Sequence, residues 1–276
     1  MFLKRFLSSI VLVLLLGGAL IYGGFFLWLL LLFISIEGQR EIYQLIVQDR
    51  QFPSKKRVDM MALCGYVGTC ALYLSLWIKN DIRDSFFIMI STLLVMMAVY
   101  VLRYPKYVPM DIIGGFFGFI YVPMLLSTVF MLRQTKGRIG LVWLIFIGSW
   151  ICDTCAYLVG SKFGRHPLAP ELSPKKSIEG AVGGVLGSCI VGGIYGYFYL
   201  RYFMHDLSFK RLLSYILLML LCSCFSQVGD LTASAFKRHY GIKDYGQLIP
   251  GHGGILDRFD SVIVVAPIVY MFSRFL

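Results

Sequence analysis

Long runs without charge are the feature of this sequence that most restricts its fold. The first extends from Phe6 to Ile36, which is 31 residues without an ionisable side chain other than tyrosine. A helix that crosses a bilayer needs about 20 apolar residues. Of the 276 residues, 58% are hydrophobic and only 15% are charged, which is too apolar for one soluble domain. Because lipid offers the backbone no hydrogen-bond partners, the runs predict an all-α, polytopic integral membrane protein.

We predict about nine transmembrane helices. The first run is long enough for a helical hairpin that turns at Gly23 and Gly24, and one long tilted helix is the alternative. The run is too long for a cleaved signal peptide, so we expect it to remain in the protein. The other spans are expected near Met60–Ile78, Ser85–Leu102, Ile112–Leu132, Ile139–Val159, the glycine-rich stretch from Gly180, Leu212–Phe236 and Ser261–Phe275.

Two stretches between the spans are polar. Glu37–Arg57 ends in a basic cluster, and we expect it to form an interfacial helix that stops near Pro53. Ser161–Gly180 contains four Lys or Arg residues and three prolines, so it cannot form one simple helix.

The basic residues indicate how the chain is oriented. The net charge of +11 could suggest nucleic acid, but the Lys and Arg residues lie between apolar runs, where they meet anionic lipid heads. We therefore expect membrane lipids and no nucleic acid as partners. With nine spans, the side of the N-terminus carries more Lys and Arg, so the positive-inside rule predicts that Ser161–Gly180 and Lys237–Arg258 face the cytosol.

Charge returns most densely in Ser234–Asp260, between two apolar runs. Basic side chains there could neutralise phosphate, glycines would let backbone N–H groups approach an anion, and carboxylates could hold a hard cation. This stretch is the predicted active-site loop. Its charged residues, together with the glycine-flanked histidine His252, are Lys237, Arg238, Lys243, Asp244, Asp257, Arg258 and Asp260.

The order S-x-F-K-R, four residues, K-D-x-G, then P-G-H-G-G-I-x-D-R-F-D resembles the signature of the phosphatidate cytidylyltransferases. The resemblance reaches upstream to about Asp153. It implies a membrane enzyme that joins the cytidylyl group of CTP to phosphatidate, releases pyrophosphate and requires Mg²⁺. It also implies N-terminal transmembrane helices in 1–135 and a catalytic region in 136–276. The family often has an acidic residue before the signature serine, where this chain has Ala233.

Three carboxylates form the predicted metal site. Asp257 and Asp260 are three positions apart, so a helix would place both on one side, able to share a cation with Asp230. An exposed first helical turn is the simpler interpretation of such a pair. The sequence leaves a second cation, monovalent or divalent, open. The role of His252 is open too: a general base, a metal ligand, a phosphate contact or a structural contact.

The remaining candidates surround this site. Asp153 lies in an apolar helix, where an unpaired carboxylate costs at least about 2.5 kcal/mol, so it should have a partner or face a cavity. On one continuous helix, Asp230, Ser234, Lys237 and Arg238 would share a face, although snorkelling also explains the two basic residues. The resemblance implies catalytic residues at Asp230, Lys237, Arg238, Lys243, Asp244, His252 and Arg258. It implies substrate-binding residues at Asp153, Ser173, Lys175, Lys176, Ser234, Gly253 and Gly254.

Other interpretations of single motifs are weaker. The glycines from Gly180 to Gly187 recur at helical spacing and predict a smooth face for helix packing; a nucleotide-cradling loop would need the missing Lys-Ser/Thr. Cys152 and Cys155 form a C-x-x-C pair, but in a membrane helix a redox or zinc role is improbable, and we expect the cysteines to be small buried side chains.

The predicted function is therefore phosphatidate cytidylyltransferase, with CTP and phosphatidate as substrates. We expect it in the bacterial cytoplasmic membrane with an active-site cavity facing the cytosol. Its rivals are another CTP-dependent lipid transferase or kinase and, from a different class, a transporter. A transporter would distribute charges along its path, whereas these gather at one face. The oligomeric state is open, a homodimer included.

Overall fold

The computed structural model describes residues 2–47, 60–135, 137–249, 251 and 253–275. Contacts divide the chain into two units. The first comprises Met1–Gln134 with Tyr240–Asp257, and the second comprises Thr135–His239 with Arg258–Leu276. This contact-based division does not test the functional division predicted near residue 135.

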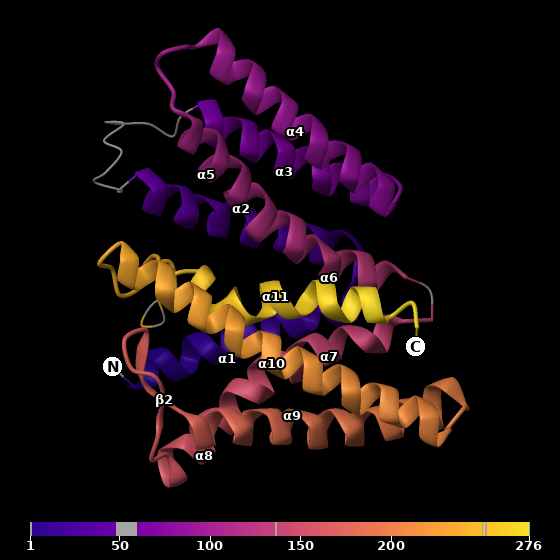
Figure 1. The fold of residues 1–276 in the computed structure, drawn as a ribbon. Coiled ribbons are helices and arrows are strands. Elements are labelled where there is room, and N and C mark those ends of the chain that lie inside the picture. The colour runs from indigo at the N-terminus through magenta and orange to yellow at the C-terminus, as the bar shows by residue number, and fades with distance from the viewer. Residues whose placement is uncertain (1, 48–59, 136, 250, 252, 276) are drawn as a thin grey trace. The chain divides into compact units, whose positions relative to one another are not determined.

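Helices dominate the described residues (Figure 1). Their bounds are α1 Phe2–Tyr22, α2 Gly24–Val47, α3 Met60–Ile78, α4 Ile82–Leu102, α5 Pro109–Phe119, α6 Leu125–Gln134, α7 Val142–Phe146, α8 Cys152–Phe163, α9 Ile178–Tyr199, α10 Phe209–His239 and α11 Leu256–Phe272. A π-helical segment with Pro123 joins α5 to α6, another joins α7 to α8, and a third continues α9.

Within the described residues, six helical stretches are long and apolar enough to cross a membrane. They run over Met60–Ile78, Ile82–Leu102, Pro109–Gln134, Ile139–Phe163, Ile178–Met204 and Phe209–His239. The all-α membrane class is therefore confirmed. Three further helices, α1, α2 and α11, fall outside this set. Among them, α2 carries Glu37, Arg40 and Glu41, and α11 has only 17 residues.

One short hairpin departs from the all-helical expectation. Strands β1 (Pro167–Ala169) and β2 (Ser173–Ser177) pair antiparallel. They lie in Ser161–Gly180, whose prolines were expected to prevent one simple helix. Ser177 ends β2 and caps α9, since its hydroxyl accepts a hydrogen bond of 3.1 Å from the Gly180 amide. The hairpin is thus attached directly to the start of α9.

In the first unit, the apolar N-terminal run is broken at Gly23. This glycine has φ +68° and Gly24 has φ +54°, a left-handed conformation that favours glycine. Arg133 then caps the end of α1, donating to the carbonyl oxygens of Leu20 at 2.6 Å and Ile21 at 2.8 Å. The predicted turn is present, and the alternative of one continuous helix is wrong.

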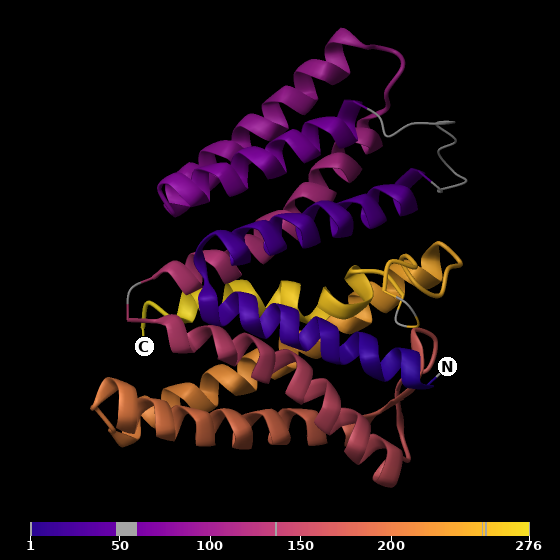
Figure 2. The same ribbon diagram turned by 180° about the vertical axis from the view of Figure 1, so that it is seen from behind.

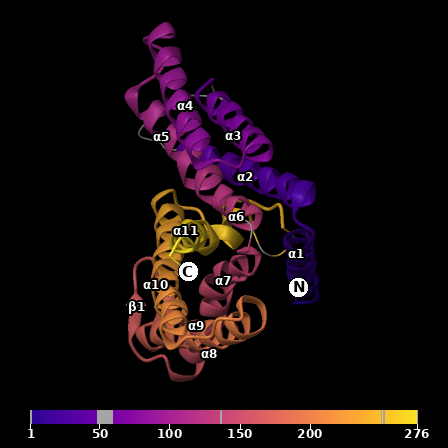
Figure 3. The ribbon, with the colours of Figure 1, turned by 90° about the vertical axis from the view of Figure 1, so that its right-hand side faces the viewer.

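The prediction of an interfacial helix in Glu37–Arg57 is wrong for the residues that the structure describes. Its described part continues α2 as far as Val47, and its polar side chains are buried: Gln39 is 0% exposed and Glu41 is 1% exposed. Gln39 accepts a hydrogen bond of 2.7 Å from Thr69 on α3, so the chain uses this polarity to join helices. Figure 3 shows α2, α3 and α5 packed in this unit. The expected stop near Pro53 lies outside the described residues.

In the second unit, α9 packs between α8 and α10, and Figure 2 shows α9 and α10 side by side. A Cβ atom on Gly184 would lie 2.8 Å from the Cys152 carbonyl oxygen, and one on Gly180 would lie 2.8 Å from that of Ala156. The glycines therefore permit close contact of α9 with α8, as predicted. The nucleotide-loop interpretation is wrong, because these glycines are helical. The expectation of buried cysteines holds only in part: Cys152 is a buried free thiol that donates to the Ser223 carbonyl, and Cys222 is buried too, but Cys70 and Cys224 are exposed.

Candidate active site

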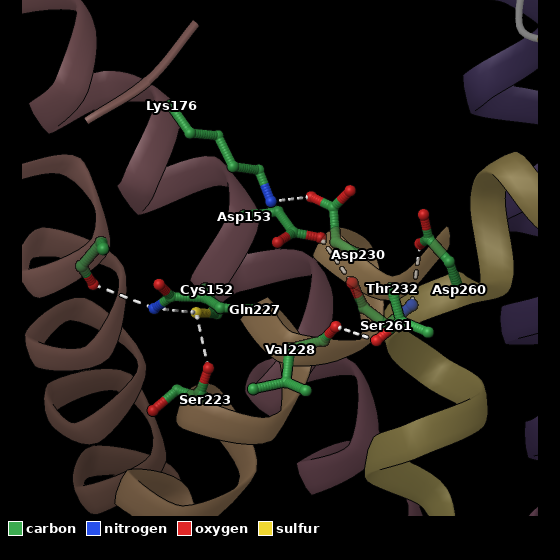
Figure 4. Close-up of polar contacts among 11 residues, drawn as sticks. Cys152, Asp153, Lys176, Ser223, Gln227, Val228, Asp230, Thr232, Asp260 and Ser261 are labelled. Atoms are coloured by element: carbon green, nitrogen blue, oxygen red, sulfur yellow. Dashed lines mark hydrogen bonds and ion pairs between the residues drawn. The ribbon is translucent and has the colours of Figure 1, made fainter. Parts of the chain in front are cut away.

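Three aspartates from three helices face one another in the second unit (Figure 4). Asp153 lies on α8, Asp230 on α10 and Asp260 on α11. Ser261 connects two of them: its hydroxyl donates to Asp153 at 3.4 Å, and its amide donates to Asp260 at 2.7 Å. Asp153 therefore has the partner that its depth in an apolar helix requires. We call Asp153, Asp230, Asp260 and Ser261 the acidic cluster.

Lys176 reaches this cluster from strand β2 and forms an ion pair with Asp230 (Figure 4). The hairpin that carries the lysine is fixed to α9 by Glu179. That carboxylate accepts hydrogen bonds from the amides of Arg165 at 3.0 Å and His166 at 3.3 Å, and it contacts the His166 ring at 2.6 Å. The segment that leads into the hairpin is therefore held at the start of α9.

The helix that carries Asp153 enters the cluster through a π-helical turn, Ile147–Ile151. Such a turn shifts the side chains that follow it, and π-bulges often occur at functional sites. Within it, the Trp150 ring N–H donates to the Arg258 carbonyl oxygen at 3.4 Å, which joins the turn to α11 two residues before Asp260.

The cluster contains more carboxyl groups than lysines. Asp260 interacts electrostatically with Asp230, Asp153 and Lys237. Asp153 interacts in the same way with Lys176. Three carboxylates thus face two lysines, and all three aspartates are only partly exposed. In the described part of the chain, no three His, Cys, Asp or Glu side chains close around a metal position. Mg²⁺ does not need such a cage, since it commonly binds one or two carboxylates plus substrate phosphates.

A cavity of about 330 Å³ opens beside the cluster. It is lined by Asp153, Lys175, Lys176, Asp230, Tyr157 and Gln227, among others. Gln227 is held by a hydrogen bond of 3.0 Å from its amide group to the Ala181 carbonyl oxygen. The cavity combines two lysines with two carboxyl groups, so its lysines can receive an anionic phosphate.

Helix α10 is continuous to His239, so the predicted face with Asp230, Ser234 and Lys237 is formed. Arg238 is exposed and donates to the Leu172 carbonyl oxygen at 3.3 Å, a contact that ties the helix to the hairpin. Ser173 begins β2, close in sequence to this contact. Ser261 and Gln227 were missed from the sequence, because Ser and Gln in an apolar helix carry no distinctive spacing.

The other predicted residues lie in the loop 240–257 of the first unit. One oxygen of Asp257 accepts hydrogen bonds of 2.9 Å from the amides of Tyr245 and Gly254. Asp257 therefore shapes the loop, and its metal role stays a prediction. Gly253 has φ +86° and forms a backbone bridge with Ile249.

Lys243 and Asp244 of this loop are exposed, and Arg258 opens the last segment of the second unit. The catalytic roles of these three residues stay predictions. His252 lies outside the described residues.

A buried glutamate that sequence reasoning missed also binds this loop. Glu41 of α2 accepts hydrogen bonds of 2.9 Å from the amides of Ile255 and Leu256. A sequence signal existed, because Glu41 follows the first apolar run closely, but it was assigned to an interfacial helix.

Comparison with known proteins gives consistent results. The model of the cytidylyltransferase family matches residues 3–276. A phosphatidate cytidylyltransferase of Synechocystis sp. is 32% identical over 297 residues, which cover 98% of this chain and 95% of that protein. One from Staphylococcus epidermidis is 34% identical over 86% of this chain and 79% of the relative. One from Thermotoga maritima is 38% identical, but the match spans only 57% of each chain.

Proposed function

We propose, because this chain belongs to the cytidylyltransferase family, that it transfers the cytidylyl group of CTP to phosphatidate and forms CDP-diacylglycerol and pyrophosphate. The observation that carries the proposal is the acidic cluster with Lys176 beside a cavity. A reaction between two phosphate anions needs both features: positive charge to reduce their repulsion and oxygen ligands to hold a cation.

In the proposed reaction, a phosphate oxygen of phosphatidate attacks the α-phosphorus of CTP. The new P–O bond forms as the bond between the α-phosphorus and the bridging oxygen of pyrophosphate breaks. The attacking phosphate is already ionised near neutral pH, so the protein needs to supply no strong base. Its task is to align the two phosphates and to neutralise their charge. Lys176, Lys237 and Arg238 are suited to the second task.

Asp230 and Asp260 would hold Mg²⁺, since carboxylates are the hard oxygen donors that this ion prefers. The bound ion would neutralise and orient phosphate oxygens. Asp257 is retained as a third candidate ligand from the sequence. Asp153 and Ser261 are proposed to keep the neighbouring carboxylates in place.

We also propose that the three helices outside the six long apolar stretches complete nine spans in a bacterial cytoplasmic membrane. Lys and Arg are then more numerous on the side of the N-terminus, which would place the hairpin of β1 and β2 and the loop 240–257 in the cytosol. A cavity open to cytosol and bilayer would admit CTP and a lipid headgroup together.

The test uses purified protein with CTP, phosphatidate and Mg²⁺, and follows CDP-diacylglycerol and pyrophosphate. Both should form in equal amounts and only with a divalent cation. Asp260→Asn should abolish turnover, because the cluster loses a ligand charge. Asp84→Asn, which removes a half-buried carboxylate paired with the exposed Lys79, is the matched control and should be active. Release of CDP in place of pyrophosphate would indicate a lipid kinase. If neither phosphatidate nor CTP is converted, the transporter interpretation is favoured.

A further inference from the structure

Glu41 is a fully buried carboxylate whose two oxygens are both used by the loop 240–257. Its Oε1 atom accepts a hydrogen bond from the Ile255 amide and its Oε2 atom accepts one from the Leu256 amide, each at 2.9 Å. The side chain is only 1% exposed. It therefore joins α2 to residues more than 200 positions away in the chain.

Two glycines of the loop make room for this carboxylate. A Cβ atom on Gly246 would lie 2.6 Å from Glu41 Oε1, and one on Gly254 would lie 2.7 Å from Oε2. Real Cβ atoms do not approach oxygen so closely, so any larger residue would displace either the loop or Glu41. These two glycines of the loop therefore fit the carboxylate of α2.

The loop offsets part of the cost of burying Glu41. An isolated buried carboxylate is costly unless hydrogen bonds and favourable charge offset its lost hydration. Arg40, the neighbouring cation on α2, pairs with Glu37 at 2.7 Å. The amides of Ile255 and Leu256 lie at the start of α11, where the helix dipole is positive. Loop conformations that lose these two hydrogen bonds are therefore disfavoured.

Asp257 fixes the same loop through different amides. It accepts from Tyr245 and Gly254, whereas Glu41 accepts from Ile255 and Leu256. Two carboxylates thus determine the backbone just before and within the first turn of α11. Asp260 follows three positions after Asp257 on this helix, so the direction of its side chain depends on how the helix begins.

We propose that Glu41 is a positioning residue for cytidylyl transfer, which sets the loop 240–257 and the first turn of α11 without touching substrate. The inference rests on the proposed function. A polar residue nearby serves for comparison: Gln39 accepts a hydrogen bond from Thr69 on α3 and donates one to Tyr43 on α2. The two roles predict different consequences when the side chains are changed.

The test compares Glu41→Gln with Gln39→Met in detergent-purified protein. The Gln variant keeps the size of Glu41 but replaces one carboxylate oxygen by an NH₂ group, which cannot accept a hydrogen bond. We expect kcat to fall about 10- to 100-fold while KM for CTP changes little, because displaced groups weaken the transition state most. Hydrogen exchange of the peptide covering 253–258 should become faster in the same variant. Gln39→Met should lower the melting temperature and leave kcat of the folded fraction unchanged.

Gly246→Ala tests the contact from the loop side and decides the matter if Glu41→Gln does not fold. It should reproduce both the loss of kcat and the faster exchange. Wild-type kcat in either folded variant, or a loss of kcat without faster exchange at 253–258, would overturn the positioning role. A wild-type protein that forms no CDP-diacylglycerol would instead reject the proposed function. The exchange measurement would then still decide whether Glu41 holds the loop.

Discussion

Replacing Lys176 by methionine tests the cluster most directly. Methionine keeps much of the apolar stem but removes the ammonium group that pairs with Asp230 (Figure 4). The variant should leave three carboxylates with less compensating charge and should deprive an incoming phosphate of a cation. Both effects predict weaker binding of the transition state, in which charge shifts towards pyrophosphate.

The magnitude follows from the exposure of the pair. The Lys176 side chain is 27% exposed and that of Asp230 is 26% exposed, so the pair lies between a surface and a buried ion pair. Surface pairs contribute about 0–1 kcal/mol, and breaking a buried pair costs about 3–5 kcal/mol. An intermediate loss of about 1–3 kcal/mol corresponds to a fall in kcat/KM of about 5- to 150-fold. Lys176→Arg keeps the charge and should recover part of this loss.

The assay is steady-state formation of CDP-diacylglycerol with CTP varied at saturating phosphatidate and Mg²⁺. Lys79→Met is the control, because Lys79 is 67% exposed and its ion pair with Asp84 is 3.4 Å long. This control should stay within about twofold of the wild type. If Lys176→Met is monodisperse, melts like the wild type and also stays within that range, the ion pair has no part in the reaction.

Three further predictions test other parts of the molecule. Lys237→Ala and Arg238→Ala should each lower kcat and kcat/KM for CTP together; variants that lose only yield or thermal stability would identify snorkelling anchors. A single cysteine at the exposed Gln247, in a background without the native cysteines, should react with an impermeant thiol reagent only from the cytosolic side, and labelling from outside would reverse the orientation. Gly184→Val should lower the free energy of unfolding by the ~1–3 kcal/mol typical of overpacking, seen as a lower melting temperature, because a Cβ there meets the Cys152 carbonyl oxygen at 2.8 Å. Gly17→Val is the control: no atom lies within 4 Å of a Cβ built at Gly17, so this variant should have the melting temperature of the wild type.

Local patterns in the sequence were sufficient for the membrane helices. The predicted span Met60–Ile78 has the same bounds as α3. The predicted span Ile139–Val159 begins at the same residue as the observed stretch Ile139–Phe163 and ends four residues earlier. Apolar length and backbone hydrogen bonding act within each segment, so they can be recognised without knowing any neighbour. The same holds for the break at Gly23 and for the glycine face of α9.

Polarity within apolar helices was harder to interpret. The partner of Asp153 was expected from the cost of its burial, but the identity of Ser261 depended on how α8 and α11 meet. The segment beginning at Glu37 was misjudged for the same reason. A polar run beside a membrane helix has the same composition whether it lies at an interface or is buried among other helices.

The sequence by itself determined the membrane class, the charged signature and the residues available for phosphate and metal chemistry, because these follow from composition and spacing. Only the tertiary structure brought Lys176 from a hairpin onto Asp230, and Glu41 from α2 onto the start of α11. In such pairings, a side chain comes within hydrogen-bond distance of a group that is distant in the chain. That distance is set by the packing of whole helices, which no local pattern of residues specifies.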